Sequence, residues 1–331
     1  MRTIDKFPWA MSFRWRPTDT GHQIDGECSL IYPPLKEQLY VEKGVRGKEF
    51  KFFLGAKPQA SSYGWVLFKG DSSHVGVFFL YSLLTAEVIK LSESDIGNEL
   101  LLVDVMTFSL DASSPKCVIF GLKVYWKKIS IHICSPSDGA WKTYEFIGFN
   151  NYVPAVHAIY ANGFFYCVFF GGQLGAFNLQ LKEWTMLTLE WPRLSDFDFK
   201  HPILVAFDEE LQMVFTDMSE ILSFKPFIYG ENYEALKLLN FDFSEKRWVK
   251  ETSLNNHVLF VGCTCFSCPA VGETSQLAIN VFSCSMWHPL IRCYDIKSNS
   301  VQYENRAKTV GRSRIWIEMS SRGSGVVRKK S

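Results

Sequence analysis

The densest group of potential metal ligands in the sequence is a set of three cysteines, Cys263, Cys265 and Cys268, with Cys284 and His288 further along the chain. Thiolates and imidazole nitrogens at short spacings hold zinc in many structural sites. Such sites favour paired Cys-x-x-Cys units, however, and the segment VLFVGCTCF around the first two cysteines alternates like a strand. We therefore interpret the cysteines as core thiols and predict no metal site and no cofactor.

The other residues suited to acid–base or phosphate chemistry form no recognisable motif. Asp208-Glu209-Glu210 follows an apolar run and is typical of a solvated turn. The segment 171–175 (GGQLG) lacks the spacing of a phosphate-binding loop and indicates a hairpin turn. The seven histidines include no pair at the i, i+4 spacing that grips zinc on a helix; they are His22, His74, His132, His157, His201, His257 and His288. We predict no catalytic residue, with a site assembled from distant loops as the alternative.

The elements that would have to position such residues are strands. The 331 residues are 47% hydrophobic and 21% charged, a globular balance, and 28 Phe with 15% aromatic residues suit the half-buried surface of a sheet. No apolar run reaches the length of a membrane helix, and the N-terminus lacks the pattern of a secretory signal. Nine irregularly spaced cysteines then indicate reduced thiols without a disulfide. We expect a cytoplasmic or nuclear protein, with organellar targeting left open.

The net charge of +1 hides an uneven distribution. Residues 306–331 carry eight Lys or Arg and one acidic residue, Glu318, so the rest of the chain is net acidic. Such a basic end is typical of a solvated tail, and a nuclear-import or nucleic-acid patch is the alternative. Outside the tail, basic and aromatic residues do not interleave along one stripe, so we predict no nucleic-acid surface.

One strand–turn–strand unit recurs along the chain. In each copy an aromatic or apolar residue ends one strand, a polar turn follows, and a Trp or aliphatic residue begins the return strand. The copies are Tyr32–Leu39, Tyr81–Val88, Cys134–Trp141, Phe177–Trp184, Phe241–Trp248 and Tyr294–Val301. We expect the turns to face solvent and the flanking apolar residues to lie in the core.

Repeats of this kind, at intervals of roughly 40 to 50 residues, are typical of a β-propeller, in which stacked blades bury faces that a single four-stranded sheet leaves exposed. We predict an all-β, kelch-like propeller of about six blades, with five or seven as alternatives. Residues 1–318 would form the single domain and 319–331 the tail. The closing strand would be Arg314–Glu318, and Tyr233–Asn240 is either a short helix or a strand.

Several short blocks resemble one known family, the plant F-box-associated β-propellers of KIB type. The first block is Ser61–Phe68 (SSYGWVLF), and Leu80–Glu87 resembles the family's Asn-Pro-x-Thr turn, although Ser82 and Leu83 replace Asn-Pro. The later blocks are Ser114–Val118, Cys134–Trp141, Asn162–Tyr166, Phe241–Trp248 and Ser253–Gly262. They occur in the family's order and cover about Phe7 to Glu318.

The resemblance implies a protein-binding propeller, the substrate-recognition part of F-box proteins in ubiquitin ligases. Its partner would be a ubiquitination target or, as in some relatives, a kinase. The chain starts at the propeller region, so we expect a member without the F-box, and docking to Skp1 and cullin is then in doubt. We expect no membrane partner. Two alternatives remain: a propeller enzyme with an axial active site, and a diverged paralog with little retained activity.

Overall fold

The computed structural model describes residues 9–17, 23–32, 37–46, 53, 55–70, 77–82, 85–91, 102–149, 153–189, 202–207, 210–216, 236–262, 264–284, 290–298, 300–306 and 314–317. Within these residues the strands form six sheets, five of four strands and one of five. We call these sheets blades 1 to 6. The predicted tail, 319–331, lies outside the described residues.

The first three blades each contain four antiparallel strands. Blade 1 is formed by β25 (Arg314–Ile317), β1 (Trp9–Pro17), β2 (Gln23–Tyr32) and β3 (Glu37–Arg46). Blade 2 is formed by β4 (Lys57–Ser62), β5 (Trp65–Lys69), β6 (Phe78–Ser82) and β7 (Val88–Lys90). Blade 3 is formed by β8 (Val105–Phe108), β9 (Ile119–Tyr125), β10 (Lys127–Cys134) and β11 (Trp141–Phe149).

The last three blades follow the same plan, with an addition in blade 6. Blade 4 is formed by β12 (Ala155–Ala161), β13 (Phe164–Phe169), β14 (Leu174–Asn178) and β15 (Glu183–Thr188). Blade 5 is formed by β16 (Pro202–Phe207), β17 (Glu210–Thr216), β18 (Leu236–Asp242) and β19 (Arg247–Glu251). Blade 6 is formed by β21 (Phe266–Pro269), β20 (His257–Val261), β22 (Asn280–Cys284), β23 (Leu290–Asp295) and β24 (Ser300–Arg306).

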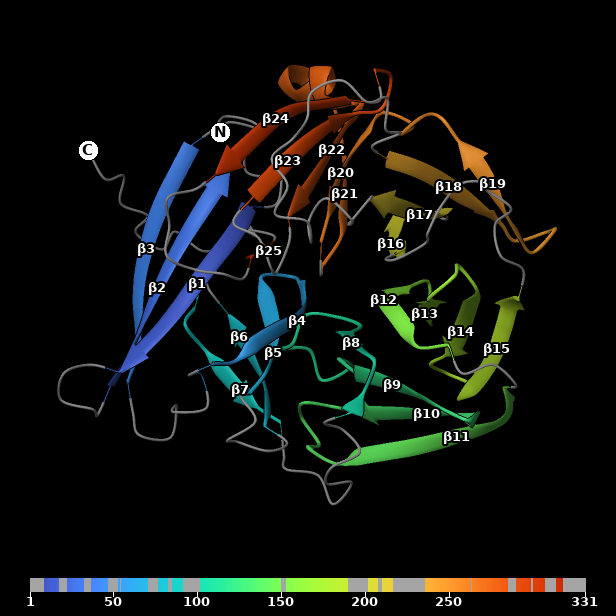
Figure 1. Ribbon diagram of the computed structural model, residues 1–331. Coiled ribbons are helices and arrows are strands. Elements are labelled where there is room, and N and C mark those ends of the chain that lie inside the picture. The colour runs from blue at the N-terminus through green and yellow to red at the C-terminus, as the bar shows by residue number, and fades with distance from the viewer. Residues whose placement is uncertain are drawn as a thin grey trace.

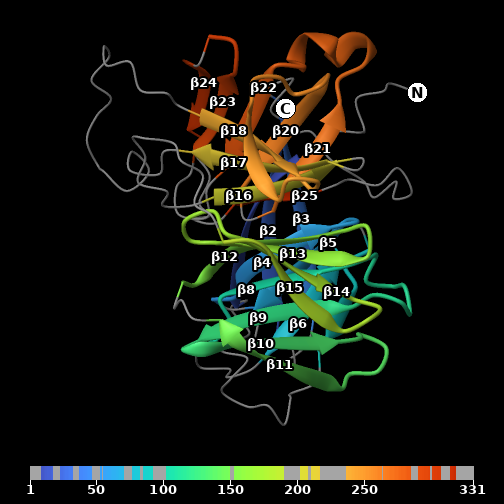
Figure 2. The ribbon, with the colours of Figure 1, turned by 90° about the vertical axis from the view of Figure 1, so that its right-hand side faces the viewer.

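The six blades stand around a common axis, each with one strand near the centre and one at the rim (Figure 1). Turned by 90°, the ring is seen from its rim (Figure 2). This is the all-β propeller that the repeats predicted, with a number of sheets inside the predicted range. No helix among the described residues is long and apolar enough to cross a membrane.

The recurring unit of the sequence is the hairpin between the two outermost strands of each blade. In five of the six copies the first and last residues are register partners: Tyr81↔Val88, Cys134↔Trp141, Phe177↔Trp184, Phe241↔Trp248 and Tyr294↔Val301. In the first copy the predicted start of the return strand, Leu39, was wrong: the strand begins at Glu37, which pairs with Tyr32, while Leu39 pairs with Leu30. The five leading residues are buried, as expected for side chains that face a neighbouring blade.

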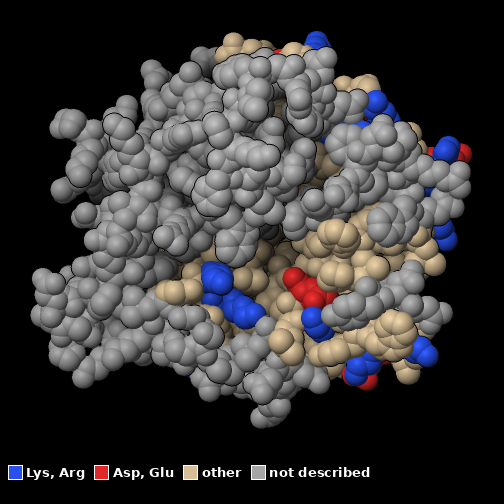
Figure 3. Space-filling view, viewed as in Figure 1, with Lys and Arg blue, Asp and Glu red and all other residues tan. Residues whose placement is uncertain are grey.

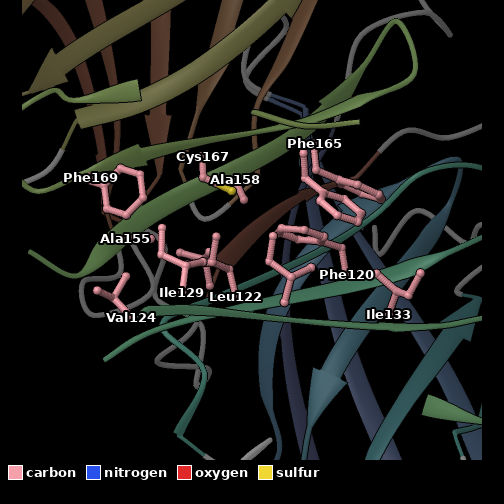
Figure 4. Close-up of a cluster of buried hydrophobic side chains, with 13 residues drawn as sticks. Phe120, Leu122, Val124, Ile129, Ile133, Ala155, Ala158, Phe165, Cys167 and Phe169 are labelled. Atoms are coloured by element: carbon pink, nitrogen blue, oxygen red, sulfur yellow. The ribbon is translucent and has the colours of Figure 1, made fainter. Parts of the chain in front are cut away.

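Aromatic side chains fill the junctions between blades. At the junction of blades 3 and 4, the rings of Phe120 and Phe165 stack (Figure 4), with their centroids 4.4 Å apart. The ring of Phe177 lies 6.0 Å from that of Phe120. All three side chains are fully buried. Burying such a side chain contributes about 1.5–3 kcal/mol, so these junctions are a main source of the ring's stability.

The ring closes through strands from opposite ends of the described chain. β25 pairs with β1 in blade 1, with Ala10 opposite Trp316, which confirms the predicted closing strand over Arg314–Ile317. Trp316 is fully buried, and its indole Nε1–H donates to the carbonyl of Val261 in blade 6 at 2.9 Å. The hydroxyl of Thr264 in turn donates to the Trp316 carbonyl at 3.0 Å, so this strand is fastened to both blades.

Blade 6 departs from the four-stranded plan. β20 runs parallel to β22 and antiparallel to β21, so the β20–β21 hairpin is inserted on the inner side of the blade. A 3₁₀ helix, Gly272–Leu277, connects β21 to β22. The segment 233–240 resolves in favour of a strand where the structure describes it, since Leu236 begins β18.

Candidate functional site

The two faces of the ring are distinguished by the connections they carry. The innermost strands of blades 4 and 5 lie side by side, since the Leu204 amide of β16 donates to Nδ1 of His157 in β12. We call the face with the hairpins 62–65, 82–88, 134–141, 161–164, 178–183, 242–247 and 295–300 the turn face. The β8–β9 connection 109–118, which carries Asp111, lies at the same end of its blade as the hairpin 134–141. The opposite face, which we call the connection face, carries the turns between second and third strands at 125–128 and 169–174.

The turn face is held by short side-chain caps. The Asp242 carboxylate accepts hydrogen bonds from the Ser244 hydroxyl at 2.6 Å and from the amides of Ser244 and Glu245 at 2.9 and 3.1 Å. The Ser244 hydroxyl and the Glu245 amide hold the pKa of Asp242 below its ordinary value. Asn178 accepts from the amides of Gln180 and Leu181, both at 2.9 Å. Such caps satisfy the backbone of a tight turn locally.

A longer cap links two blades. Asp111, in the connection between β8 and β9, accepts from the Ser113 amide at 2.9 Å and from the Ser113 hydroxyl at 2.7 Å. The same oxygen accepts from the indole Nε1–H of Trp65 in blade 2, at 3.1 Å. Trp65 is buried, so this bond satisfies a donor that has left water. Asp111 therefore fixes a turn of blade 3 against blade 2.

Near the axis, His157 joins three blades. Its Nδ1 accepts a hydrogen bond from the Leu204 amide at 3.2 Å, which places the ring proton on Nε2. Nε2 lies 3.7 Å from the sulfur of Cys265, and that thiol donates to the Gly262 carbonyl at 3.6 Å. The imidazole thus bridges β12, β16 and the connection leading into β21, and it is 8% exposed.

A cysteine beside a histidine invites comparison with a catalytic pair. A histidine that activates a thiol must accept its proton at the nitrogen facing the sulfur. Here Nε2 already carries the proton, and forming the imidazolium would turn Nδ1 into a donor facing the Leu204 N–H. The geometry therefore favours a structural bridge at His157.

The cysteines of the candidate metal group are separated in the described residues. Cys268 and Cys284 lie together in the cluster that holds Phe260 and Trp316, whereas Cys265 packs against the opposite side of blade 6, towards blade 5. Cys263 and His288 lie outside the described residues. Within the part of the chain that the structure describes, no three metal-binding side chains come together.

The described cysteines are free thiols, and most are buried. Burial raises the pKa of Cys117 and of Cys134 to about 11, and that of Cys293 to about 12. Because the thiolate is the reactive form, these residues are poor nucleophiles at neutral pH. They behave as the core thiols that the sequence predicted.

The remaining residues considered for chemistry occupy structural positions. Gly171 and Gly172 have positive φ in the connection between β13 and β14, which confirms a hairpin turn there. Glu210 begins β17, while Asp208 and Glu209 lie outside the described residues. His132 is buried beside Thr143 in blade 3, with its Nδ1 3.0 Å from the hydroxyl. His257 lies at the start of β20 with its ring 4.6 Å from that of Phe207; His22, His74 and His201 are not described.

The connection face carries charges around a recess near the middle of the ring (Figure 3). In blade 3, Lys123 forms an ion pair with Asp104 at 2.7 Å, and the second oxygen of Asp104 accepts from the Val124 amide at 3.0 Å. In blade 2, Lys57 at the start of β4 and Lys69 at the end of β5 are register partners. Lysines therefore gather here from two neighbouring blades.

The same face exposes aromatic surface that the sequence analysis did not single out. Trp126 lies in the two-residue turn between β9 and β10 and is 69% exposed, beside Lys127, which has a φ of 66°. Ile147 of β11 pairs with Lys128 next to this turn and is 89% exposed. The sequence did contain an indication of this exposed residue, because Trp126 directly precedes two lysines, Lys127 and Lys128, at the turn.

Comparison with known proteins places these features in a family context. A protein-family profile described as "KIB1-4 beta-propeller" matches residues 39–284. The F-box/kelch-repeat protein At1g57790 of Arabidopsis thaliana is 28% identical over 198 residues, which cover 59% of this chain and 51% of the relative. The F-box protein At3g56470 of the same plant is 24% identical, with coverages of 56% and 46%. The chain thus spans about half the length of the curated relatives it matches.

The solved structures that the chain resembles include two with 10% sequence identity each. They are the AfRom2 CNH domain, with a TM-score of 0.39 and coverages of 89% of this chain and 84% of that chain, and the nidogen/laminin complex, with a TM-score of 0.41 and coverages of 89% and 92%.

Proposed function

Because the chain belongs to the KIB1-4 β-propeller family, we propose that it is a non-enzymatic protein-binding propeller that recognises the target of an F-box-type ubiquitin ligase. The ligase role is motivated by the names of two relatives, which are F-box proteins. The partner is then a protein destined for ubiquitination or a kinase, met in the cytoplasm or the nucleus.

The observation that carries the proposal is the division between the two faces. On the turn face, Asn178 and Asp242 are engaged in capping their own hairpins. The connection face carries Trp126, which is largely exposed. Recognition residues concentrate on segments held by a rigid scaffold, and Trp is enriched among residues that dominate protein interfaces. We therefore assign partner binding to the connection face.

The state of the described His157 and cysteine side chains supports a binding role over an enzymatic one. His157 is engaged through both ring nitrogens, and the described cysteines with shifted pKa values are poor nucleophiles. An axial active site would instead need several polar groups converging with pKa values suited to proton transfer.

The proposal is tested by affinity purification of the tagged chain from plant cells, followed by mass spectrometry with recovery of Skp1 and cullin scored separately. We expect a reproducible partner that is absent when Trp316 is replaced by Ala, because this variant weakens ring closure. Co-recovery of Skp1 and cullin would support the ligase role. The absence of any partner specific to the intact ring would contradict the binding role.

A further inference from the structure

The rim of blade 3 is an open sheet edge. β11 is the outermost strand of this blade (Figure 1). At nine residues it is longer than the rim strands β7, β15 and β19, which have three, six and five. Among the described residues, those at 142–148 form their hydrogen bonds only towards β10. Because alternate residues of an antiparallel edge strand turn their N–H and C=O groups outward, β11 presents a row of backbone donors and acceptors on its outer side.

The composition of β11 does little to protect the middle of this edge. Most of its residues are of types that favour a strand; they are Trp141, Thr143, Tyr144, Phe146, Ile147 and Phe149. Natural edge strands are commonly blunted by Lys, by Pro or by a bulge. In β11, Lys142 lies near the start, and Gly148, with a φ of 107°, is the extra residue where the register shifts near the end. In the stretch 143–147 between them, the charged residue Glu145 is already paired with Lys128 of β10, so the middle of the strand is open to pairing.

Apolar side chains on both sides of β11 are available to a neighbour. Alternate residues share a side of a strand. Phe146 packs on the side towards blade 4 and is only partly buried, whereas Ile147 lies on the other side and is 89% exposed. At the connection face the strand ends at Phe149, which pairs with Lys127, the residue next to the exposed Trp126. The edge therefore combines free backbone groups with apolar surface.

We propose that an extended segment of the partner protein adds to β11 as a further strand of blade 3. The inference deepens the proposed function and rests on it, because the segment follows the rim to Trp126 on the connection face. A row of backbone donors and acceptors is matched by another extended backbone. Strand addition to an exposed sheet edge is a common mode of peptide recognition.

The side chains of β11 define the chemistry of the segment. Glu145 and Lys128 form an ion pair, so the net charge along the strand comes from Lys142, which is exposed and forms no ion pair with another described residue. An acidic residue opposite Lys142 complements this charge, since cross-strand pairs of opposite charge are favourable. Aromatic or β-branched residues beside Phe146 and Ile147 cover their exposed surface. The segment is thus a short, mainly apolar strand with an acidic residue near one end.

Proline substitution at the edge tests the backbone pairing directly. Of the neighbours Tyr144 and Glu145, one turns its N–H towards β10 and the other turns it outward. Proline has no N–H and is tolerated on the open side of an edge strand, so one of Tyr144→Pro and Glu145→Pro should melt like the Ala variant of the same residue. This tolerated variant should recover the partner of the unmodified chain about fivefold less well in affinity purification from plant cells, the scale of one lost backbone hydrogen bond.

Two controls separate the backbone from the side chains and from the rest of the rim. Tyr144→Ala and Glu145→Ala remove the same side chains but keep the N–H, and the one matched to the tolerated proline should recover the partner as the unmodified chain does. Val249→Pro and Lys250→Pro place the same pair of changes in β19 of blade 5, and the one that keeps the melting temperature should leave recovery unchanged. In the purified complex, hydrogen exchange at residues 142–147 should be slower than in the free chain.

Equal recovery by the unmodified chain and the tolerated proline variant would overturn the strand addition, while the binding role stands. Equal losses in the proline variant and its alanine control would also overturn it, because the contact is then made by the side chain. A dimer of the unmodified chain that the proline variant abolishes, measured by analytical ultracentrifugation, would show that a second copy occupies the edge and would likewise overturn the proposal. If the unmodified chain recovers no specific partner, the binding role itself is contradicted, and the strand addition with it.

Discussion

The turn face and the connection face are built from the same strands yet differ in what their side chains accomplish. On the turn face, Asp111, Asn178 and Asp242 use their oxygens to satisfy nearby backbone or a neighbouring blade. On the connection face, Trp126 is exposed, and Lys57 and Lys69 lie side by side. On the connection face Asp104 is bonded in the same local way, to Lys123 and the Val124 amide, but this face also presents an exposed Trp suited to contact with another molecule.

This difference indicates that separate residues of a propeller can determine stability and partner recognition. A residue that caps a hairpin should affect unfolding and leave partner binding intact, while an exposed residue on the opposite face should do the reverse. The ring closure underlies both, because neither face keeps its geometry once the blades separate.

The largest effect is expected from Trp316→Ala, which should disturb both faces because it weakens the closure of the ring. Removing this fully buried side chain leaves a cavity between blades 1 and 6 and deletes the bond to the Val261 carbonyl. We expect a loss of about 3–5 kcal/mol in the free energy of unfolding, measured by chemical denaturation. Trp316→Phe, which keeps most of the ring volume, should lose clearly less; equal losses would show that packing is not the cause.

Asp111→Ala should have the next largest effect and should be confined to stability. It leaves the buried indole of Trp65 without its acceptor, which costs about 1–3 kcal/mol. Asp111→Asn keeps an oxygen in place and should recover most of the loss in thermal melts. Reduced partner recovery by folded Asp111→Ala would contradict the assignment of binding to the connection face.

Asp242→Ala should lower the melting temperature less than Asp111→Ala, and in a pH-dependent way. The folded pKa of Asp242 lies below its ordinary value, so its carboxylate stabilises the fold fully above that ordinary value of 3.8. The contribution is lost as the pH falls through the lower folded pKa. The gap in melting temperature between the variant and the unmodified chain should therefore be constant near neutral pH and close in acid. A gap that persists unchanged at low pH would refute this.

Trp126→Ser should have the smallest effect on stability, and it tests whether the connection face binds the partner. The indole is largely exposed, so the free energy of unfolding should change by no more than about 0.5 kcal/mol. Partner recovery in affinity purification should fall, because an exposed Trp is a common interface anchor. Unchanged recovery would remove Trp126 from the proposed binding surface.

The blade pattern could be predicted from sequence because hairpins are local. In five copies of the repeated unit the first and last residues are register partners, since a tight turn between Phe177 and Trp184, or between Phe241 and Trp248, fixes which residues pair. In the N-terminal copy the return strand begins at Glu37, two residues before the predicted Leu39, which the pattern of residue types did not reveal. The parallel pairing of β20 with β22 was also missed, since it joins strands that are not consecutive.

Contacts between different strands and blades were harder to predict, because they depend on how distant parts of the chain pack. Lys57 and Lys69 become neighbours only through the register of β4 and β5, and they meet Lys123 only because blades 2 and 3 stack. The bridge from His157 to Leu204 and Cys265 likewise joins residues from three blades. Short motifs do not encode contacts between distant residues. The sequence analysis therefore predicted that most cysteines are core thiols, but it did not predict which residues His157 contacts.

The pairing of β1 with β25 has a consequence for the kinetics of folding. Most ladders in blades 2 to 6 join strands that are close in sequence, whereas Ala10 must find Trp316 near the other end of the chain. Bringing distant segments together carries a larger loop-closure entropy and slows folding. We therefore expect blade 1 to form last and to open first, so that the rate at which this seam separates governs the lifetime of the native ring.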